Sequence, residues 1–210
     1  ITGQNIEHSK EQWRKDREPK EMIFGFNRRI LAYFAVDLYE AAVATELKKE
    51  KTFFIPFNQG SNGAGNDGGK GNPVNPNGYP TAYLWEDVLK KDSALDIVQK
   101  FIHCKDNKIL IFPRFHQLDV VRKLIADVRK NGTGINYLIQ HSAGSGKTNS
   151  IAWLAHRLTS LHDADNRIIF DNVIIVTDRV VVDRQLQKAI MGMEHKAGLI
   201  RVMDDKCNSA

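Results

Sequence analysis

Cysteine is scarce in this sequence, with two residues among 210. Cys104 and Cys207 have neither the spacing of a metal site nor that of a disulfide framework, which favours a reducing, cytoplasmic location. Long apolar runs are absent too, since none approaches the roughly 18 residues that a membrane-spanning helix needs, and no signal peptide is visible. These absences exclude a disulfide-stabilised secreted domain and predict a protein without a membrane partner.

An initial methionine is missing, because the chain begins with Ile1, and residues 204–210 stop without a clear structural end. We therefore expect a piece of a longer polypeptide. The 42% hydrophobic and 26% charged residues are typical of a soluble globular protein. A net charge of +5 is compatible with a nucleic-acid partner, but the charges are interspersed, so this indication is weak.

The most informative motif is a glycine-rich loop between the apolar run 135–140 and a predicted helix. It consists of His141, Ser142, Ala143, Gly144, Ser145, Gly146, Lys147 and Thr148. The glycines let the backbone approach an anion closely, and the helix N-terminus directs its amides toward that anion. In such a P-loop, Lys147 reaches the β- and γ-phosphates of ATP, and the Thr148 hydroxyl binds Mg²⁺. The alternative is a glycine loop that ends in Lys-Thr by chance, and His141 does stand where the general pattern has glycine.

Two further segments suit a nucleotide-dependent DNA motor. Gln117 offers a hydrogen-bond donor and an acceptor together, which match one edge of adenine, and Phe115 could stack on the base or pack behind it. This arrangement resembles the adenine-reading Gln motif of superfamily 2 helicases, although a glutamine at a helix start is usually a solvated polar residue. Thr177 and Arg179 follow an apolar run, where they could hold a nucleic-acid phosphate. In the simpler alternative, Asp178 caps the next helix and Arg179 is solvated.

The first part of the chain is β-prone. Residues 1–25 are polar and predict a helix or an irregular arm. Three β-prone runs at 30–36, 39–45 and 52–57 predict an antiparallel sheet. Glycine and asparagine then dominate residues 58–80, which predicts a long flexible surface loop rather than a second phosphate loop, because no Gly-Lys-Ser/Thr follows.

From residue 81 onward the pattern alternates between helices and strands. Helices are expected over 92–102, over 118–128 with a stop at Asn131 and Gly132, from the P-loop to 158, and over 179–191. Extended segments are expected over 109–112, 135–140, 173–176 and 199–202. Such alternation around a P-loop predicts an open parallel α/β sheet, with a domain change near residues 80–105.

Residues 111–119, 136–156 and 176–179 resemble the R (restriction and motor) subunit of type I restriction endonucleases, as do residues 57–60 and 79–89. The histidine in place of the first P-loop glycine fits that family. The resemblance implies an α/β protein in two parts. Residues 1–92 would be the β-rich, α+β, C-terminal part of a PD-(D/E)xK-type nuclease domain. Residues 93–210 would be the first part of RecA-like motor domain 1, an incomplete P-loop parallel sheet.

The resemblance also implies a function. Such a subunit is a type I site-specific deoxyribonuclease that translocates double-stranded DNA using ATP and Mg²⁺, together with modification and specificity subunits. The Asp-Glu-x-His box and the second motor domain of the family are absent here, so we expect this stretch to bind nucleotide but to be inactive by itself. The alternatives are another superfamily 2 DNA helicase or ATPase, and a non-catalytic DNA-binding scaffold.

A nuclease-like pattern also occurs at Asp37, Glu46 and Lys48, where carboxylates could hold Mg²⁺ and the lysine could assist a water molecule. Residues 46 and 48 would share one face of a strand. Since a charged turn follows directly, we interpret them as solvated charges at a strand end. The resemblance places the true nuclease residues before Ile1.

Overall fold

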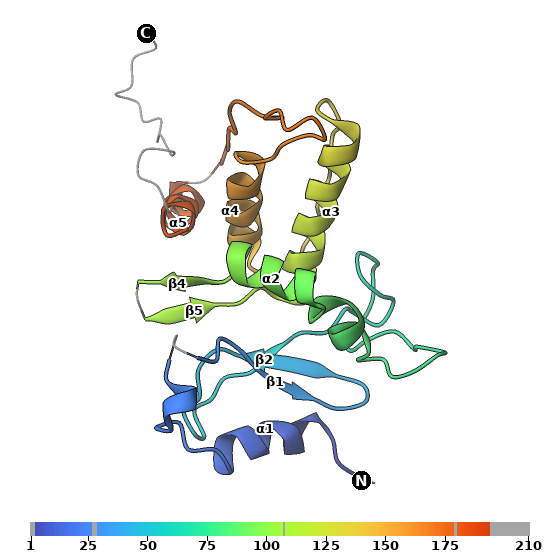
Figure 1. The fold of residues 1–210 in the computed structure, drawn as a ribbon, viewed down its shortest axis with the longest axis vertical. Coiled ribbons are helices and arrows are strands. Elements are labelled where there is room, and N and C mark those ends of the chain that lie inside the picture. The colour runs from blue at the N-terminus through green and yellow to red at the C-terminus, as the bar shows by residue number, and fades with distance from the viewer. Residues whose placement is uncertain (1–2, 27–28, 107, 179, 194–210) are drawn as a thin grey trace. The chain divides into compact units, whose positions relative to one another are not determined.

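The computed structural model of the chain describes residues 3–26, 29–106, 108–178 and 180–193 (Figure 1). The chain divides into two compact units, Ile1–Asp119 (unit 1) and Val120–Ala210 (unit 2). None of the helices in the described ranges combines the length and the apolar character that crossing a membrane requires.

Unit 1 contains the antiparallel sheet that the sequence predicts. Its strands are β1 (Tyr33–Val36), β2 (Ala41–Ala44) and β3 (Ile55–Pro56), paired in the order β1-β2-β3. The second β-prone run, 39–45, begins and ends with polar residues, but all four residues of β2 are buried. The strand is shorter than expected, and the polar residues of the run fall outside it.

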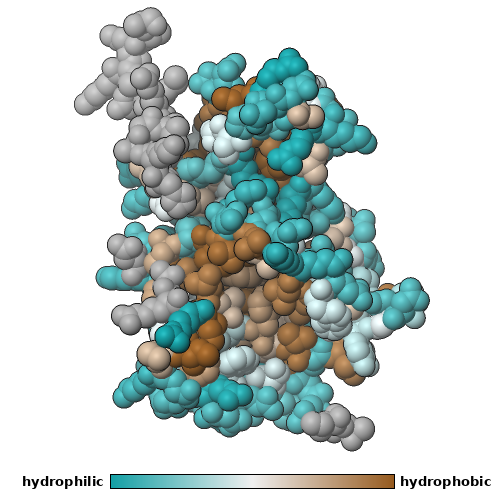
Figure 2. Space-filling model, in the orientation of Figure 1, coloured by the Kyte–Doolittle hydropathy of each residue, from teal (hydrophilic) through white to brown (hydrophobic). Residues whose placement is uncertain are grey.

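Helix α1 (Ile6–Lys15) packs against β1. Its start is capped by the Asn5 side chain, which accepts hydrogen bonds from the backbone N–H groups of Glu7 and His8. Ile6 joins a buried cluster with Ala35, Ala42, Ala44 and Phe54. The surface of α1 is mainly hydrophilic, whereas apolar side chains gather over the strands of unit 1 (Figure 2).

An aromatic cluster forms a second packing centre in unit 1. Phe57 is fully buried, and its ring centroid lies 5.6 to 5.9 Å from those of Phe34, Phe112 and Phe115. The Tyr83 ring lies 5.2 Å from Phe115, and burial raises the pKa of the Tyr83 hydroxyl. Residues 112 and 115 thus belong to the core of unit 1, and the domain boundary expected after residue 92 stays a prediction.

Residues 58–80 form the predicted loop, without helix or strand, but residues 58–72 of this loop are tied to each other and to the sheet. The N–H of Gly60 donates to Gly71 O, and the Asn72 side chain donates to Tyr39 O at 2.8 Å. The Asn58 side chain accepts from the Ala41 N–H at 2.7 Å and from the Asn72 side chain. Hydrogen bonds from asparagine side chains therefore order this part of the loop, which contains few apolar residues.

The rest of unit 1 is built from short elements. They are the 3₁₀ turn η1 (Met22–Phe24), the π-helical turn η2 (Leu84–Val88), helix α2 (Lys91–Lys100), and the antiparallel strands β4 (His103–Lys105) and β5 (Ile109–Ile111). Helix α2 contacts η2. The helix predicted from residue 92 and the extended run from 109 are confirmed, and Cys104 is a free thiol.

Unit 2 is helical in its described part. Helix α3 (Phe115–Asn131) starts in unit 1 and continues into unit 2, where α4 (Lys147–Leu158) and α5 (Val180–Met191) follow. All three helices were predicted. Gly132, with φ +75°, ends α3, and its N–H donates to Val128 O at 2.8 Å, as expected for a glycine helix stop.

The strands predicted at 135–140 and 173–176 are not formed, and this part of the prediction is wrong for the structure. Both segments lack strand pairing, and Leu138 is 94% exposed and Val176 88% exposed. A parallel strand needs neighbours to accept and donate its backbone hydrogen bonds, and the described residues of unit 2 provide none. The segment 199–202 lies outside the described residues, and the RecA-like sheet stays a prediction.

Candidate functional site

The P-loop sequence folds into a tight turn that leads directly into α4. Gly144 has φ +72° and Gly146 has φ +83°, a region that disfavours residues with a side chain. A Cβ atom at Gly144 would meet no atom within 4 Å, so backbone conformation rather than crowding requires glycine there. Ser145 between them is buried, and its N–H donates to Ser142 O at 3.3 Å. The glycines thus set the shape of the loop.

The Lys147 side chain folds back over the loop. Its Nζ donates to the carbonyl oxygens of His141 and Ser142, each at 2.9 Å, although the side chain is exposed to solvent. The ammonium group therefore lies at the mouth of the loop instead of extending away from it. A phosphate bound there would replace the two carbonyl oxygens as acceptor of the Lys147 hydrogen bonds, because a charged acceptor binds an ammonium group more strongly.

The N-terminus of α4 adds further donors. Gly146 precedes the helix and offers no side chain to cap it. The N–H groups of Lys147 and Thr148 belong to the first turn and have no acceptor within the helix. Together with the helix dipole, such amides favour an anion at this end. The half-buried Thr148 belongs to the same turn, and the role of its hydroxyl as a Mg²⁺ ligand stays a prediction.

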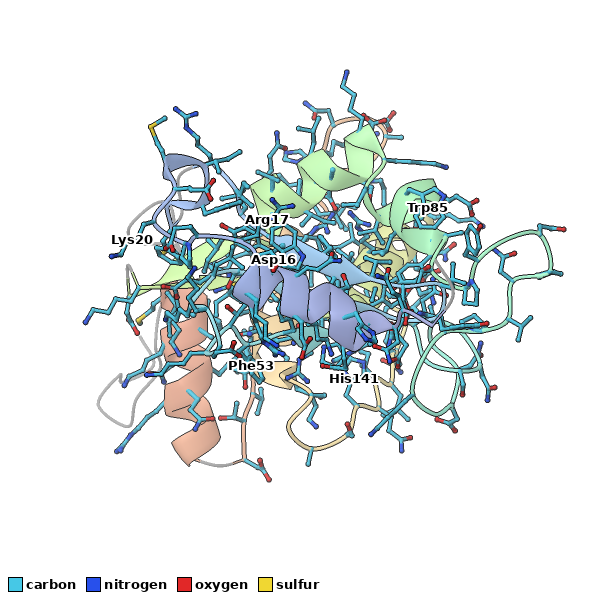
Figure 3. All side chains as sticks on the ribbon, turned by 90° about the horizontal axis from the view of Figure 1, so that it is seen from below. Asp16, Arg17, Lys20, Phe53, Trp85 and His141 are labelled. Atoms are coloured by element: carbon cyan, nitrogen blue, oxygen red, sulfur yellow. The ribbon has the colours of Figure 1, made fainter. Side chains whose placement is uncertain are left out.

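His141, labelled in Figure 3, is half-buried at the start of the loop. Two causes lower the pKa of His141 below its ordinary value: mainly the partial burial of the ring, and to a smaller extent the positive charge of Lys147. Because the ring favours its neutral form, the loop carries the single positive charge of Lys147 near neutral pH.

The approach to the loop is held by α3. The Tyr137 hydroxyl donates to an Asp127 carboxylate oxygen at 2.6 Å, and the Asn131 side chain donates to the other oxygen of that carboxylate. The bond from Tyr137 lowers the pKa of Asp127 and raises that of Tyr137. This bond ties Tyr137, in the segment that precedes the P-loop, to α3.

Gln117 has a local structural role in unit 1. It is 3% exposed, and its Oε1 accepts the Arg114 N–H at 2.8 Å. This is one half of a capping box, in which a Gln in the first turn satisfies the N–H that precedes the helix. Phe115 is buried among aromatic rings, so in this structure it packs in the core and does not present its face to a base. Adenine reading by Gln117 stays a prediction.

The other predicted positions have simpler surroundings. Thr177 is half-buried and Asp178 is exposed, in the segment that leads into α5, whereas Arg179 lies outside the described residues. Their proposed contact with DNA stays a prediction.

The nuclease-like residues do not converge on a metal site in the described chain. The Asp37 carboxylate accepts the N–H groups of Ile6, Tyr39 and Glu40 at 2.7 to 2.8 Å. Glu46 forms an ion pair with Lys48 at 2.7 Å. Among the described residues, no group of three His, Cys, Asp or Glu side chains could hold a metal ion. Asp37 is therefore a structural carboxylate.

Comparison with known proteins adds one finding. Residues 116–204, less than half of the chain, match the SWI2/SNF2 ATPase family. The match begins at the start of α3, includes the P-loop and supports a superfamily 2 helicase-like ATPase, which implies nucleotide binding. No curated protein and no solved structure matches the chain.

Several residues that organise this region were missed from the sequence. The apolar run 135–140 assigns Tyr137 to a strand, and the pattern of residues 118–128 makes Asp127 a polar position of a helix. Their contact joins residues ten apart across a turn that contains Gly132 and Gly134, and only the tertiary structure reveals it. His156 lies in the segment 136–156, and its sequence context gives no signal of a contact with α5. One contact does have a sequence signal: a glutamine three residues after Arg114 is the spacing of a capping box, which predicts the bond from the Arg114 N–H to Gln117.

Proposed function

We propose that this chain is part of the DNA-translocating restriction subunit of a type I restriction endonuclease, and that residues 142–148 bind the triphosphate of ATP with Mg²⁺. The observation that carries the proposal is the Lys147 ammonium group held over a glycine loop at the start of α4. The match of residues 116–204 to SWI2/SNF2 ATPases supports its nucleotide-binding part, and the resemblance of residues 57–60, 79–89 and 111–119 supports its restriction part.

In this proposal each group of the loop has a separate task. Lys147 leaves the carbonyls of His141 and Ser142 and binds the β- and γ-phosphates. The first-turn amides of α4 would bind phosphate oxygens, and the Thr148 hydroxyl would help to hold the magnesium ion. When bound, Mg²⁺ neutralises charge on the phosphates. Gln117 reads adenine, and Thr177 with Arg179 contacts the phosphates of double-stranded DNA.

The wider assignment follows the same proposal. Residues 1–92 would close a PD-(D/E)xK-type nuclease domain, and residues 93–210 would begin the first RecA-like motor domain. The partners would be double-stranded DNA and the modification and specificity subunits. The sequence contains no Asp-Glu-x-His box after the P-loop, so we expect nucleotide binding without rapid hydrolysis from this chain.

Isothermal titration tests the nucleotide site directly. Mg·ATP should bind the chain, Mg·GTP should bind more weakly, and Lys147→Ala should weaken both. Equal affinity for ATP and GTP would remove the role of Gln117. Absence of ATP binding by the wild-type chain would favour the scaffold alternative and contradict the proposal.

A second candidate is a superfamily 2 DNA-dependent ATPase unrelated to restriction, which the SWI2/SNF2 match by itself favours equally. Co-elution with the modification and specificity subunits of a type I system separates the two. A stable complex would support the restriction assignment, whereas the second candidate predicts none.

A further inference from the structure

Helices α4 and α5 are joined by a directional contact as well as by apolar packing. The two helices pack against each other, and both bury apolar side chains, among them Trp153 on α4 and Leu186 and Ile190 on α5. In addition, His156 Nε2 of α4 lies 2.8 Å from the carbonyl oxygen of Ile190. Because a carbonyl only accepts, His156 must carry its proton on Nε2 and donate it.

The acceptor is a carbonyl at the end of a helix. Ile190 lies in the last turn of α5, where carbonyl groups have no partner within the helix. The N–H of Met193 donates to the same oxygen at 3.1 Å, and the N–H of Gly192 closes the turn on Lys188 O at 3.0 Å. His156 therefore acts as a cap on α5 that is supplied by a neighbouring helix.

The hydrogen bond from His156 also affects how α5 is positioned on α4. Figure 1 shows α4 upright and α5 nearly end-on, and Figure 3 shows α5 from the side, so the two helices cross steeply. Apolar packing is non-directional and allows one helix to slide on the other. A hydrogen bond from a side chain to a backbone carbonyl holds a single register.

Each helix begins at a segment to which the proposed function gives a task. The P-loop leads into α4, and residues 177–178 lead into α5. We infer that His156 is a positioning residue that makes α5 move with α4, so that a change at the nucleotide loop reaches the segment before α5. This inference rests on the proposed binding of ATP at residues 142–148, and His156 itself touches no substrate.

Amide hydrogen exchange on the 210-residue chain, with and without Mg·ATP, tests the inference. In the wild type, Mg·ATP should slow exchange in the P-loop and also in α5. His156→Leu should make exchange in α5 about fivefold faster, the value expected from one net hydrogen bond. Mg·ATP should still protect the P-loop of this variant but no longer change exchange in α5.

Two conservative variants separate the hydrogen bond from simple packing. His156→Gln carries an N–H donor at a distance from the backbone close to that of Nε2, and it should restore the response of α5 to Mg·ATP. His156→Asn places its donor closer to the backbone, near the position of Nδ1, and should behave like His156→Leu. A residue that only stabilised the fold would change α5 exchange equally with and without nucleotide.

The outcomes distinguish this inference from the proposed function. Protection of α5 by Mg·ATP in His156→Leu, as in the wild type, overturns the inference and leaves ATP binding intact. If Mg·ATP protects the wild-type P-loop but not α5, the inference is likewise overturned and ATP binding stands. Absence of any Mg·ATP effect on the wild-type P-loop contradicts the proposed function, and the inference with it.

A measurement on the wild type keeps the test independent of whether the variants fold. Nitrogen-15 chemical shifts of the His156 ring report its tautomer. A protonated Nε2 and an unprotonated Nδ1 agree with the cap on α5. A neutral ring protonated on Nδ1 overturns the inference, because that tautomer cannot donate to Ile190.

Discussion

Replacing Lys147 with methionine should separate the stability of the empty loop from its affinity for nucleotide. Methionine keeps the length of the side chain and removes the ammonium group. In the empty loop that group makes two hydrogen bonds of 2.9 Å, to the carbonyls of His141 and Ser142, while exposed to solvent. The structure therefore predicts different effects of this change on folding and on binding.

The effect on folding should be small. Water competes for an exposed ammonium group, so losing both hydrogen bonds should cost no more than about 1 kcal/mol. For a chain of this size the unfolding midpoint should fall by roughly 2–4 °C at most. The effect on ATP should be larger, because charge-assisted contacts to phosphate contribute about 1.5–3 kcal/mol, or about 10- to 150-fold in affinity.

Titration calorimetry with Mg·ATP and thermal unfolding on the same samples measure both effects. Lys130→Met is a matched control, since Lys130 is an exposed lysine at the end of α3, and it should change neither quantity. Lys147→Met that binds ATP as tightly as the wild type would refute the assignment of the loop. So would an equal loss of affinity in Lys130→Met, because general charge would then explain the binding.

Three further predictions use other residues. Gln117→Glu keeps the acceptor for the Arg114 N–H but lacks the amide donor and buries a carboxyl group, whereas Gln117→Met removes both donor and acceptor. Both variants should reduce the preference for ATP over GTP in a binding titration, and both should lower the unfolding midpoint. Because the pKa of His141 is lowered in the folded state, that state binds fewer protons than the unfolded one, so stability should fall as pH drops from about 7.5 to 5.5. His141→Gln should reduce this dependence of stability on pH, measured by urea unfolding. An unchanged pH dependence would contradict the role given to His141. Asp37→Ala removes the acceptor of three backbone N–H groups and should cost roughly 2–4 kcal/mol in urea unfolding, with a smaller cost for Asp37→Asn.

Local patterns predicted the helices and the antiparallel sheet well, because each depends on residues close in sequence. Gly132 ends α3, as the pair Asn131-Gly132 indicated, and the helix after Gly146 begins where the P-loop pattern requires. The sequence also identified the loop itself, since its glycines have the positive φ angles that the pattern implies.

Side-chain contacts between distant residues could not be predicted in the same way. Asp37 looked like a metal ligand by type and spacing, but its oxygens bind backbone N–H groups of residues 6, 39 and 40. The composition of residues 58–80 predicted a flexible surface loop, yet Asn58 and Asn72 tie it to the backbone of residues 39 and 41. Composition gives the number of donors and acceptors but not their partners.

The two apolar segments without strand pairing affect how solutions of this chain should behave. Leu138, Ile174 and Val176 are largely exposed on segments without strand pairing, an arrangement that favours association with another molecule. Light scattering should therefore show particle size increasing with protein concentration, and a charged residue in place of Ile174 should suppress the increase. The colloidal stability of this polypeptide would then depend on what covers these two exposed apolar segments.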